Sequence, residues 1–189
     1  MRRLTLICAA TALIAGGAIA EAPAPDPAQG QNSRDGRHDF DWEIGSWNTQ
    51  LRLLRNPLSG AAPAWADYQG TSEVRPILDG RFNLVELSVA GAGGRIEGAA
   101  LRLYDPRSRQ WSLNYANVRS GTLTTPVYGS FDGHGRGSFY AHDTLDGRAI
   151  LVRFIITVTS PREARFEQAY SADDGRSWET NWIAVDTRR

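Results

Sequence analysis

Apolar and polar residues alternate with a period of two along most of the chain from Trp47 onward. That alternation is typical of half-buried β-strands, and no stretch keeps an apolar stripe at helical spacing for three turns. The runs are short and are bounded by Gly, Pro, Asp and Asn. The pattern predicts ten strands, over residues 46–55, 65–78, 81–90, 95–104, 110–118, 123–132, 136–145, 148–159, 163–172 and 177–187. One short helical turn is expected before them, over residues 40–44.

Two connections between these strands carry a specific turn signal. Asp79-Gly80 and Asp146-Gly147 suit the two-residue type I′ hairpin, in which both central residues need positive φ. About ten sequential antiparallel strands with short links predict an all-β fold. We therefore expect an antiparallel up-and-down barrel, because closure of the sheet removes its exposed edges.

The first residues differ from the rest. A basic start at Arg2-Arg3 precedes an apolar run over residues 4–19 and a small-x-small end at Ala18-Ile19-Ala20, which predicts a signal peptide over residues 1–20. The run is shorter than the roughly 20 residues of a membrane helix, so we expect a periplasmic or secreted protein with no membrane span after cleavage. Residues 21–38 are predicted to be a disordered linker, and residues 39–189 a single barrel domain.

Composition excludes several chemistries. Cys8 is the single cysteine and lies in the predicted leader, so disulfides, a Cys nucleophile and thiolate metal sites are not expected in the mature chain. The chain has no lysine, which excludes Schiff-base catalysis. Its 21 basic and 21 acidic residues balance, which predicts no nucleic-acid partner. The three histidines are not at ligand spacing, so we expect no metal site.

A motif at the first strand resembles a known group of barrels. Gly45-Ser46-Trp47 after a short turn and before a β meander resembles the calycins: lipocalins, fatty-acid-binding proteins and nitrobindins. With residues 39–47, 165–171 and 178–182, the domain is similar to a bacterial family of calycin-like barrels of unknown function. The resemblance implies the fold and carries over no activity.

The sequence also departs from these relatives. Nitrobindins continue the motif with Gly-x-Gly and hold haem through a late histidine, whereas Asn48-Thr49-Gln50 follows here and no histidine lies beyond His142. We therefore expect no haem and no other cofactor. Residues 171–178 resemble a single Asp-box hairpin, for which we expect a structural role: Asp173 accepts hydrogen bonds within the turn, Gly175 takes positive φ and Trp178 packs beneath.

Hairpin registers sort the polar residues by face. The Asp146-Gly147 turn sets Phe139 opposite Phe154, and it places Asp143 beside Ile150 on the same core-facing row. Continuing that row through a tight turn at Pro161-Arg162 places Ile156 beside Glu167.

The same reading sets Glu167 opposite Trp182, and it puts Tyr170 on the outer face beside Arg153. Glu167 is thus a candidate interior carboxylate, which would need a partner or a raised pKa. The alternative is a structural acid bonded to Arg165 or to a Trp N–H.

A second pair of acids lies beside the Asp79-Gly80 turn. Its register makes Glu73 and Glu86 direct cross-strand neighbours, an unfavourable arrangement unless the two are solvated, share a proton or hold a cation. Facing the lumen, they would form a general acid and base. The residues that alternate with Glu73 and Glu86 along the two strands are more apolar and suit the core better. The two acids are therefore favoured as a solvated pair on the outer face, near Arg75.

Together these features predict an exported barrel that holds a small, partly apolar ligand, as a monomer or weak homodimer. Ligand-binding candidates are Trp47, Asp143, Glu167 and Trp182. Two alternatives stay open. The barrel could be an enzyme doing acid–base chemistry (an isomerase, cyclase or hydrolase) through Glu167, Glu73 or Glu86, although we lean against enzymatic activity. Alternatively, the chain could be a carbohydrate-binding β-sandwich with several exposed Trp.

Overall fold

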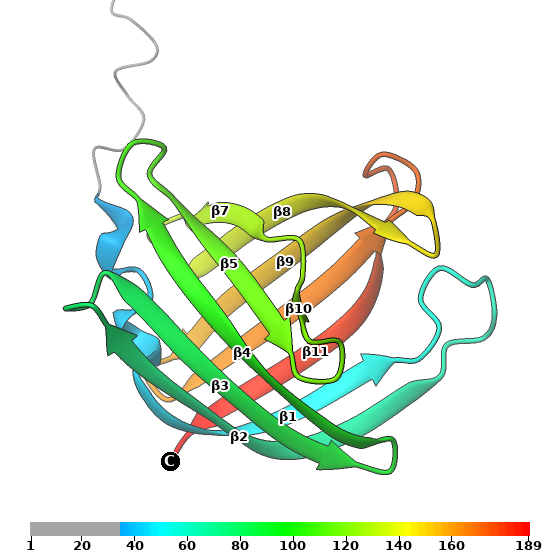
Figure 1. Cartoon of the computed structure of the whole chain (residues 1–189), viewed down its shortest axis with the longest axis horizontal. Coiled ribbons are helices and arrows are strands. Elements are labelled where there is room, and N and C mark those ends of the chain that lie inside the picture. Colours follow the sequence, from blue (N-terminus) through cyan, green and yellow to red (C-terminus); the bar gives the residue numbers. More distant parts are fainter. Residues whose placement is uncertain (1–34) are drawn as a thin grey trace, which may run out of the picture. The chain divides into compact units, whose positions relative to one another are not determined.

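The structure is a computed structural model that describes residues 35–189; the predicted signal peptide and most of the predicted linker lie outside this range. Ten strands close into an antiparallel barrel (Figure 1). Among the described residues, a two-residue strand, β6, pairs only with β5 on the outside of the barrel. The strands are β1 (Gly45–Leu54), β2 (Trp65–Ile77), β3 (Phe82–Gly91), β4 (Gly94–Asp105), β5 (Gln110–Asn117), β6 (Thr122–Leu123), β7 (Val127–Phe131), β8 (Arg136–Leu145), β9 (Arg148–Ser160), β10 (Glu163–Ser171) and β11 (Glu179–Arg188).

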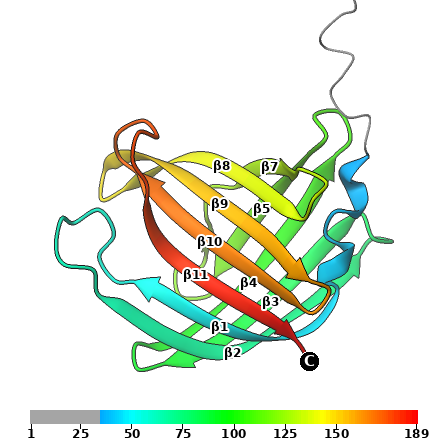
Figure 2. The ribbon, with the colours of Figure 1, turned by 180° about the vertical axis from the view of Figure 1, so that it is seen from behind.

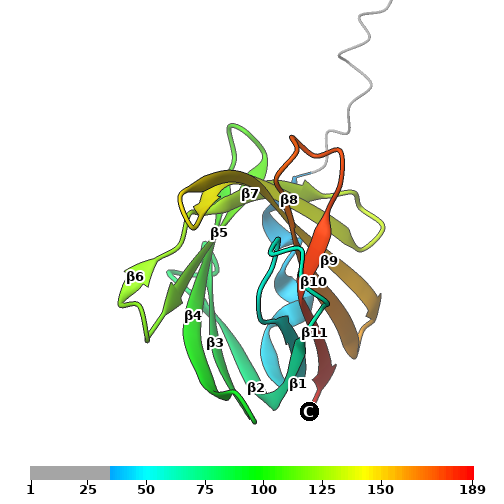
Figure 3. The same cartoon turned by 90° about the vertical axis from the view of Figure 1, so that its right-hand side faces the viewer.

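The strands follow one another around the barrel in chain order. Each strand pairs with the next, except that β6 pairs with β5 alone among the described strands; β5 also pairs with β7, and β11 returns to pair with β1. The ring is visible in Figure 3, where β6 stands away from it. This arrangement confirms the predicted up-and-down barrel and excludes the β-sandwich alternative.

One predicted strand is broken in two. The expected run over residues 123–132 is divided into β6 and β7 by Thr124-Thr125-Pro126. Pro126 has no N–H to donate to a ladder and restricts the residue before it. The interruption lets β7 continue the barrel wall while β6 remains outside it.

The two tight hairpins have the predicted registers. Asp79 and Gly80 have φ of 58° and 79°, and Asp146 and Gly147 have φ of 51° and 78°, as a type I′ turn requires. Glu73 lies opposite Glu86. Phe139 lies opposite Phe154, and Asp143 lies opposite Ile150.

The β9–β10 hairpin differs from the prediction because it contains a bulge. Glu163 pairs with Ser160 but Ala164 pairs with Val158, so Thr159 is an extra residue on β9. The Thr159 hydroxyl donates to the Glu163 carbonyl at 3.0 Å. Beyond the bulge every pairing moves by one position, which exchanges the two faces of the strand.

The predicted neighbours of Glu167 are therefore wrong. Phe166, rather than Glu167, lies opposite Ile156, and Glu167 pairs with Ile183 instead of Trp182. The pairing of β10 with β11 has a second irregularity. Gln168 pairs with Trp182 but Ala169 pairs with Thr180, so Asn181 is an extra residue on β11.

A short N-terminal segment packs against one end of the barrel (Figure 2). It contains two 3-10 turns, η2 (Gly36–His38) and η3 (Asp41–Glu43). Between them, Phe40 is fully buried and contacts Trp111 and Phe131 edge-on at centroid distances of 4.9 and 5.1 Å. The Trp111 indole N–H donates to the Gly36 carbonyl at 2.9 Å. The folded unit thus includes Gly36–His38, upstream of the predicted boundary at residue 39.

Most aromatic side chains of the described chain pack in or against the core. None of the six Trp is among the exposed large hydrophobic residues of the described chain, which are Leu78, Val118, Leu123, Tyr128 and Tyr140. The coplanar exposed Trp of a sugar-stacking surface are therefore not seen. Across residues 35–189, no helix has the length and apolar character needed to cross a membrane.

Candidate functional site: the barrel cavity

The barrel encloses a cavity of about 680 Å³. This is within the range of about 300–1,000 Å³ for small-molecule sites. Its walls are largely apolar and come from almost every strand; the apolar lining side chains include Leu53, Val85, Leu87, Ile96, Leu113, Val127, Val152, Phe154, Phe166 and Trp182. The side chains of this small barrel therefore do not fill its lumen.

Three charged side chains form the floor of the cavity, at the end packed by the N-terminal segment. Glu43 comes from η3, Arg102 from β4 and Asp186 from β11, and their exposed fractions are 1%, 5% and 4%. Arg102 forms an ion pair with Glu43. Its guanidinium also lies over the Phe40 ring, 4.3 Å from the centroid, a cation–π contact.

Burial shapes the titration of Arg102. Loss of hydration lowers the pKa of Arg102 to about 9, and the charge of Asp186 opposes that shift. A group with this pKa remains protonated at neutral pH. The floor therefore keeps its single positive charge.

Asp186 is shifted in the opposite sense. Burial raises the pKa of Asp186 to about 6, against the opposing effects of hydrogen bonding by Thr49 and the charge of Arg102. The Thr49 hydroxyl also lies 2.7 Å from the Ser72 hydroxyl. Within the described residues, Oδ1 of Asp186 has no hydrogen-bond partner. At neutral pH the floor thus contains a buried carboxylate oxygen with unused accepting capacity.

Polar groups continue up the wall. Burial raises the pKa of the Tyr115 and Tyr170 phenols, and the Tyr115 hydroxyl has no partner within the described chain. Asp143 adds to the shift of the Tyr170 pKa through its charge, and it accepts a hydrogen bond from the Thr125 hydroxyl at 3.2 Å. These groups give the middle of the cavity directional contacts.

The rim of the cavity is exposed and mixed in charge. Arg95 and Glu97 form an ion pair at 3.2 Å, and Arg119 donates to the Arg95 carbonyl at 3.4 Å. Val118, beside them, is an exposed apolar residue. These residues come from β4 and from the segment after β5, which therefore border the entrance.

The predicted ligand-binding residues fall into two groups. Asp143 and Trp182 both line the cavity. Trp47 is fully buried outside the lining, where its indole N–H donates to the Glu43 carbonyl at 2.6 Å. It supports the floor from below.

Glu167 lies outside the cavity. Its side chain faces the outer surface, where it is 35% exposed and accepts a hydrogen bond from Arg165 at 3.0 Å. The bulge at Thr159 is the cause, because it turns Phe166 and Gln168 inward and Glu167 outward. Placing Glu167 in the lumen was wrong, and its contact with Arg165 is the one that the structural alternative predicted.

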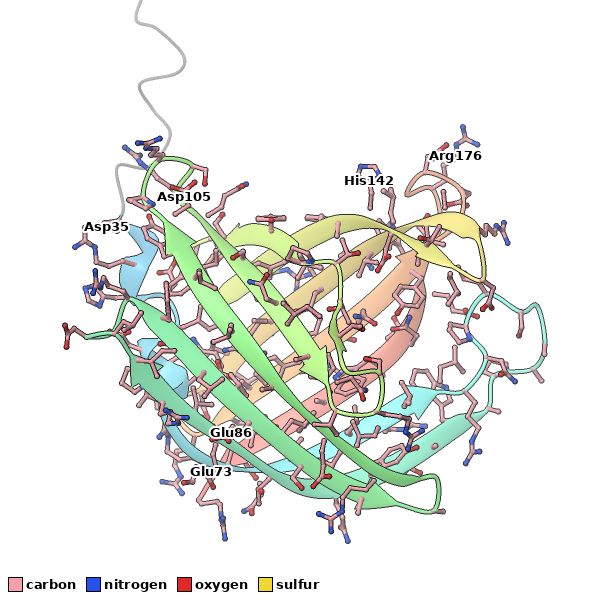
Figure 4. The ribbon with its side chains drawn as sticks, viewed as in Figure 1. Asp35, Glu73, Glu86, Asp105, His142 and Arg176 are labelled. Atoms are coloured by element: carbon pink, nitrogen blue, oxygen red, sulfur yellow. The ribbon has the colours of Figure 1, made fainter. Side chains whose placement is uncertain are left out.

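Glu73 and Glu86 form a solvated pair on the outside of β2 and β3 (Figure 4). Arg189 lies 3.7 Å from Glu73, and Arg75 lies 3.7 Å from Glu86. Neither acid lines the cavity, so the pair is not a lumenal acid and base. His142 is exposed at the outer surface, and within residues 35–189 no three His, Cys, Asp or Glu side chains are grouped to hold a metal ion.

The loop over residues 171–178 has the expected internal hydrogen bonds. The Ser177 backbone N–H and hydroxyl donate to Asp173 at 2.9 and 2.6 Å, and these bonds, led by the Ser177 hydroxyl, lower the pKa of Asp173 to about 2. Gly175 has φ of 83°, and the Trp178 indole N–H donates to its carbonyl at 3.0 Å. The loop does not line the cavity.

Sequence reasoning missed the charged floor. Asp186 shares the inward row of β11 with Trp182 and Ala184, so the period of two from Trp182 was a usable signal. The sequence has no comparable signal for Arg102. Leu101 and Leu103 flank it, and the neighbouring residues on both faces of this strand are apolar, so alternation does not show which face points inward. Glu43 lies in a 3-10 turn, where strand periodicity does not apply.

No family model matches the sequence, and no curated protein matches it. Among solved structures, the chain is similar to an S-type phycobiliprotein lyase from Guillardia theta, with 14% identity over 83% of this chain and 94% of that one and a TM-score of 0.55. Two further solved structures also align over 82% of this chain and 99% of theirs. One is an mFAP2b barrel bound to DFHBI (11% identity, TM-score 0.43), and the other is a de novo fluorescence-activating barrel (13% identity, TM-score 0.41). At these identities the comparison with the lyase supports the calycin-like fold alone.

Proposed function

We propose that this protein binds a small, partly apolar molecule inside the barrel. The observation that carries the proposal is the cavity of about 680 Å³, which combines apolar walls with polar side chains on its floor, wall and rim; its volume and its apolar walls suit a ligand site. The barrel from Guillardia theta, to which the fold is similar, is a phycobiliprotein lyase. Because residues 1–20 have the basic start and apolar run of a signal peptide, we also propose that the protein is exported to the periplasm or secreted.

Two matched substitutions on β4 test the cavity as the binding site. Ala100 lines the cavity, whereas Ala99 lies opposite Glu86 on the outward row. We expect the Phe ring of Ala100→Phe to occupy part of the lumen and exclude an apolar fluorescent dye. The dye should bind about tenfold or more weakly, a loss of about 1.4 kcal/mol or more in binding free energy. The matched control Ala99→Phe should leave dye affinity near that of the wild type. Equal dye affinity for both folded variants would place the binding site elsewhere.

The enzymatic alternative now depends on a different acid. Glu167, Glu73 and Glu86 lie outside the cavity, but Asp186 lines it with its pKa raised to about 6, a value that suits proton transfer near neutral pH. The ligand recovered from the protein distinguishes the two functions. A carrier returns the bound molecule with its covalent structure unchanged, whereas an enzyme converts it; NMR spectra of the molecule before and after incubation detect this even when isomerisation leaves its mass unchanged.

A further inference from the structure

The charge at the cavity floor suggests which class of ligand the barrel accepts, an inference that rests on the proposed function. The floor combines two carboxylates, Glu43 and Asp186, with one guanidinium, Arg102. All three side chains are more than nine-tenths buried. Because buried charges interact strongly, one unbalanced negative charge at this depth favours a positive partner.

Arg102 is already engaged. It is paired with Glu43 and stacked on Phe40, so its charge is largely balanced within the floor. An anionic ligand group would have to displace Glu43 or sit beside both carboxylates. Nε of Arg102 also lacks a hydrogen-bond partner among residues 35–189, which makes an anion the competing ligand class that an experiment must separate.

Asp186 is only partly compensated: the Thr49 hydroxyl and the charge of Arg102, which is paired with Glu43, favour its ionised form but do not offset its burial. Its Oδ1 has no partner among the described residues, and the side chain lines the cavity. A buried ionised carboxylate is costly unless it is paired and hydrogen-bonded. A protonated amine would supply both the opposite charge and the missing donor.

Apolar walls extend from Asp186 toward the entrance. Asp186, Ala184 and Trp182 follow one another on the inward row of β11, with Phe166 opposite Ala184. At about 3.3 Å per residue, the distance from Asp186 to Trp182 is roughly 13 Å along the strand. That length suits an elongated apolar body attached to the amine.

We propose that the lumen binds an amphipathic organic cation, whose ammonium group pairs with Asp186 and whose apolar body lies against Phe166 and Trp182. The ligand enters with its charged end first. It completes the floor as two ion pairs, Arg102 with Glu43 and the ammonium with Asp186.

Three probes with one chain length test this proposal: decylammonium, decanol and decanoate, each measured by displacement of the apolar dye at pH 7.5. We expect the wild-type protein to bind decylammonium about tenfold or more tightly than either other probe, the scale expected of a buried charge pair. Asp186→Asn should reduce decylammonium affinity to that of decanol. The control Asp67→Asn, on an acid whose side chain is 80% exposed on β2, should leave the order of affinities unchanged.

Tightest binding of decanoate would overturn the proposal in favour of Arg102 as an anion site. Equal affinities for the three probes would overturn it as well, and the wild-type order decides even if Asp186→Asn fails to fold. If the dye binds in the lumen while decylammonium shows no preference, this inference fails and the proposed function stands. If neither dye nor probe binds, the proposed function fails with it.

Discussion

At the scale of single residues, burial controls the chemistry of this barrel more than residue type does. Glu73, Glu86 and Glu167 are acids on the outer surface near arginines, where ion pairs contribute little. Asp186 is an acid of the same class, but its burial raises its pKa to about 6. The position of an acid on the inward or outward row therefore decides whether it has a candidate role.

Asp186 predicts a specific dependence of stability on pH. Its folded pKa of about 6 lies above the ordinary value of 3.8, so the folded state holds a proton that the unfolded state releases between those two pH values. The free energy of unfolding contributed by this group therefore falls as pH rises from about 4 to 6. We expect the stability of Asp186→Asn relative to wild type to rise by about 2–3 kcal/mol between pH 4 and pH 7.

Urea denaturation of both proteins at several pH values measures this difference. Arg102 and the Thr49 hydroxyl act on Asp186, and they and Glu43, the partner of Arg102, are common to both proteins, so their effects largely cancel. Asp67→Asn serves as the exposed control and should show no such trend. A difference between Asp186→Asn and wild type that stays constant with pH would contradict the raised pKa.

At the scale of elements, the sequence predicted strands well and registers only where the turns are tight. The period of two located the strands, and Asp-Gly turns fixed the pairing of Glu73 with Glu86 and of Phe139 with Phe154. The bulge at Thr159 was invisible, because an inserted residue leaves the local alternation intact on both sides. That single residue moved Glu167 out of the lumen and Tyr170 into it.

Deletion of Thr159 tests the bulge. Without the extra residue, either the β9–β10 turn or the inward face of β10 must change, so Phe166 loses its core position or the hairpin is strained. We expect the deletion to lower the free energy of unfolding by about 2 kcal/mol or more, the range of core disruption. Thr159→Ser is the matched variant, since it keeps the residue and the hydroxyl that donates to Glu163. Equal stability of the two in urea denaturation would show that the bulge does not set the register.

At the scale of the whole molecule, the barrel has one supported end and a hollow interior. The N-terminal segment packs Phe40 beneath the floor, with Trp47 and Trp111 buried beside the same end. The closed fold followed from alternation and turn chemistry, but the packing of Gly36–His38 against its end did not, because those residues were assigned to the linker. The empty lumen did not, because cavity volume depends on how side chains from ten strands meet across the interior.

A crystal structure of the protein with decylammonium tests the central claim most directly. We expect density for the probe inside the lumen, with its nitrogen within hydrogen-bonding distance of Asp186 Oδ1 and its chain along Phe166 and Trp182. A lumen filled by rearranged side chains, or a probe bound only on the outer surface, would contradict a ligand-binding barrel.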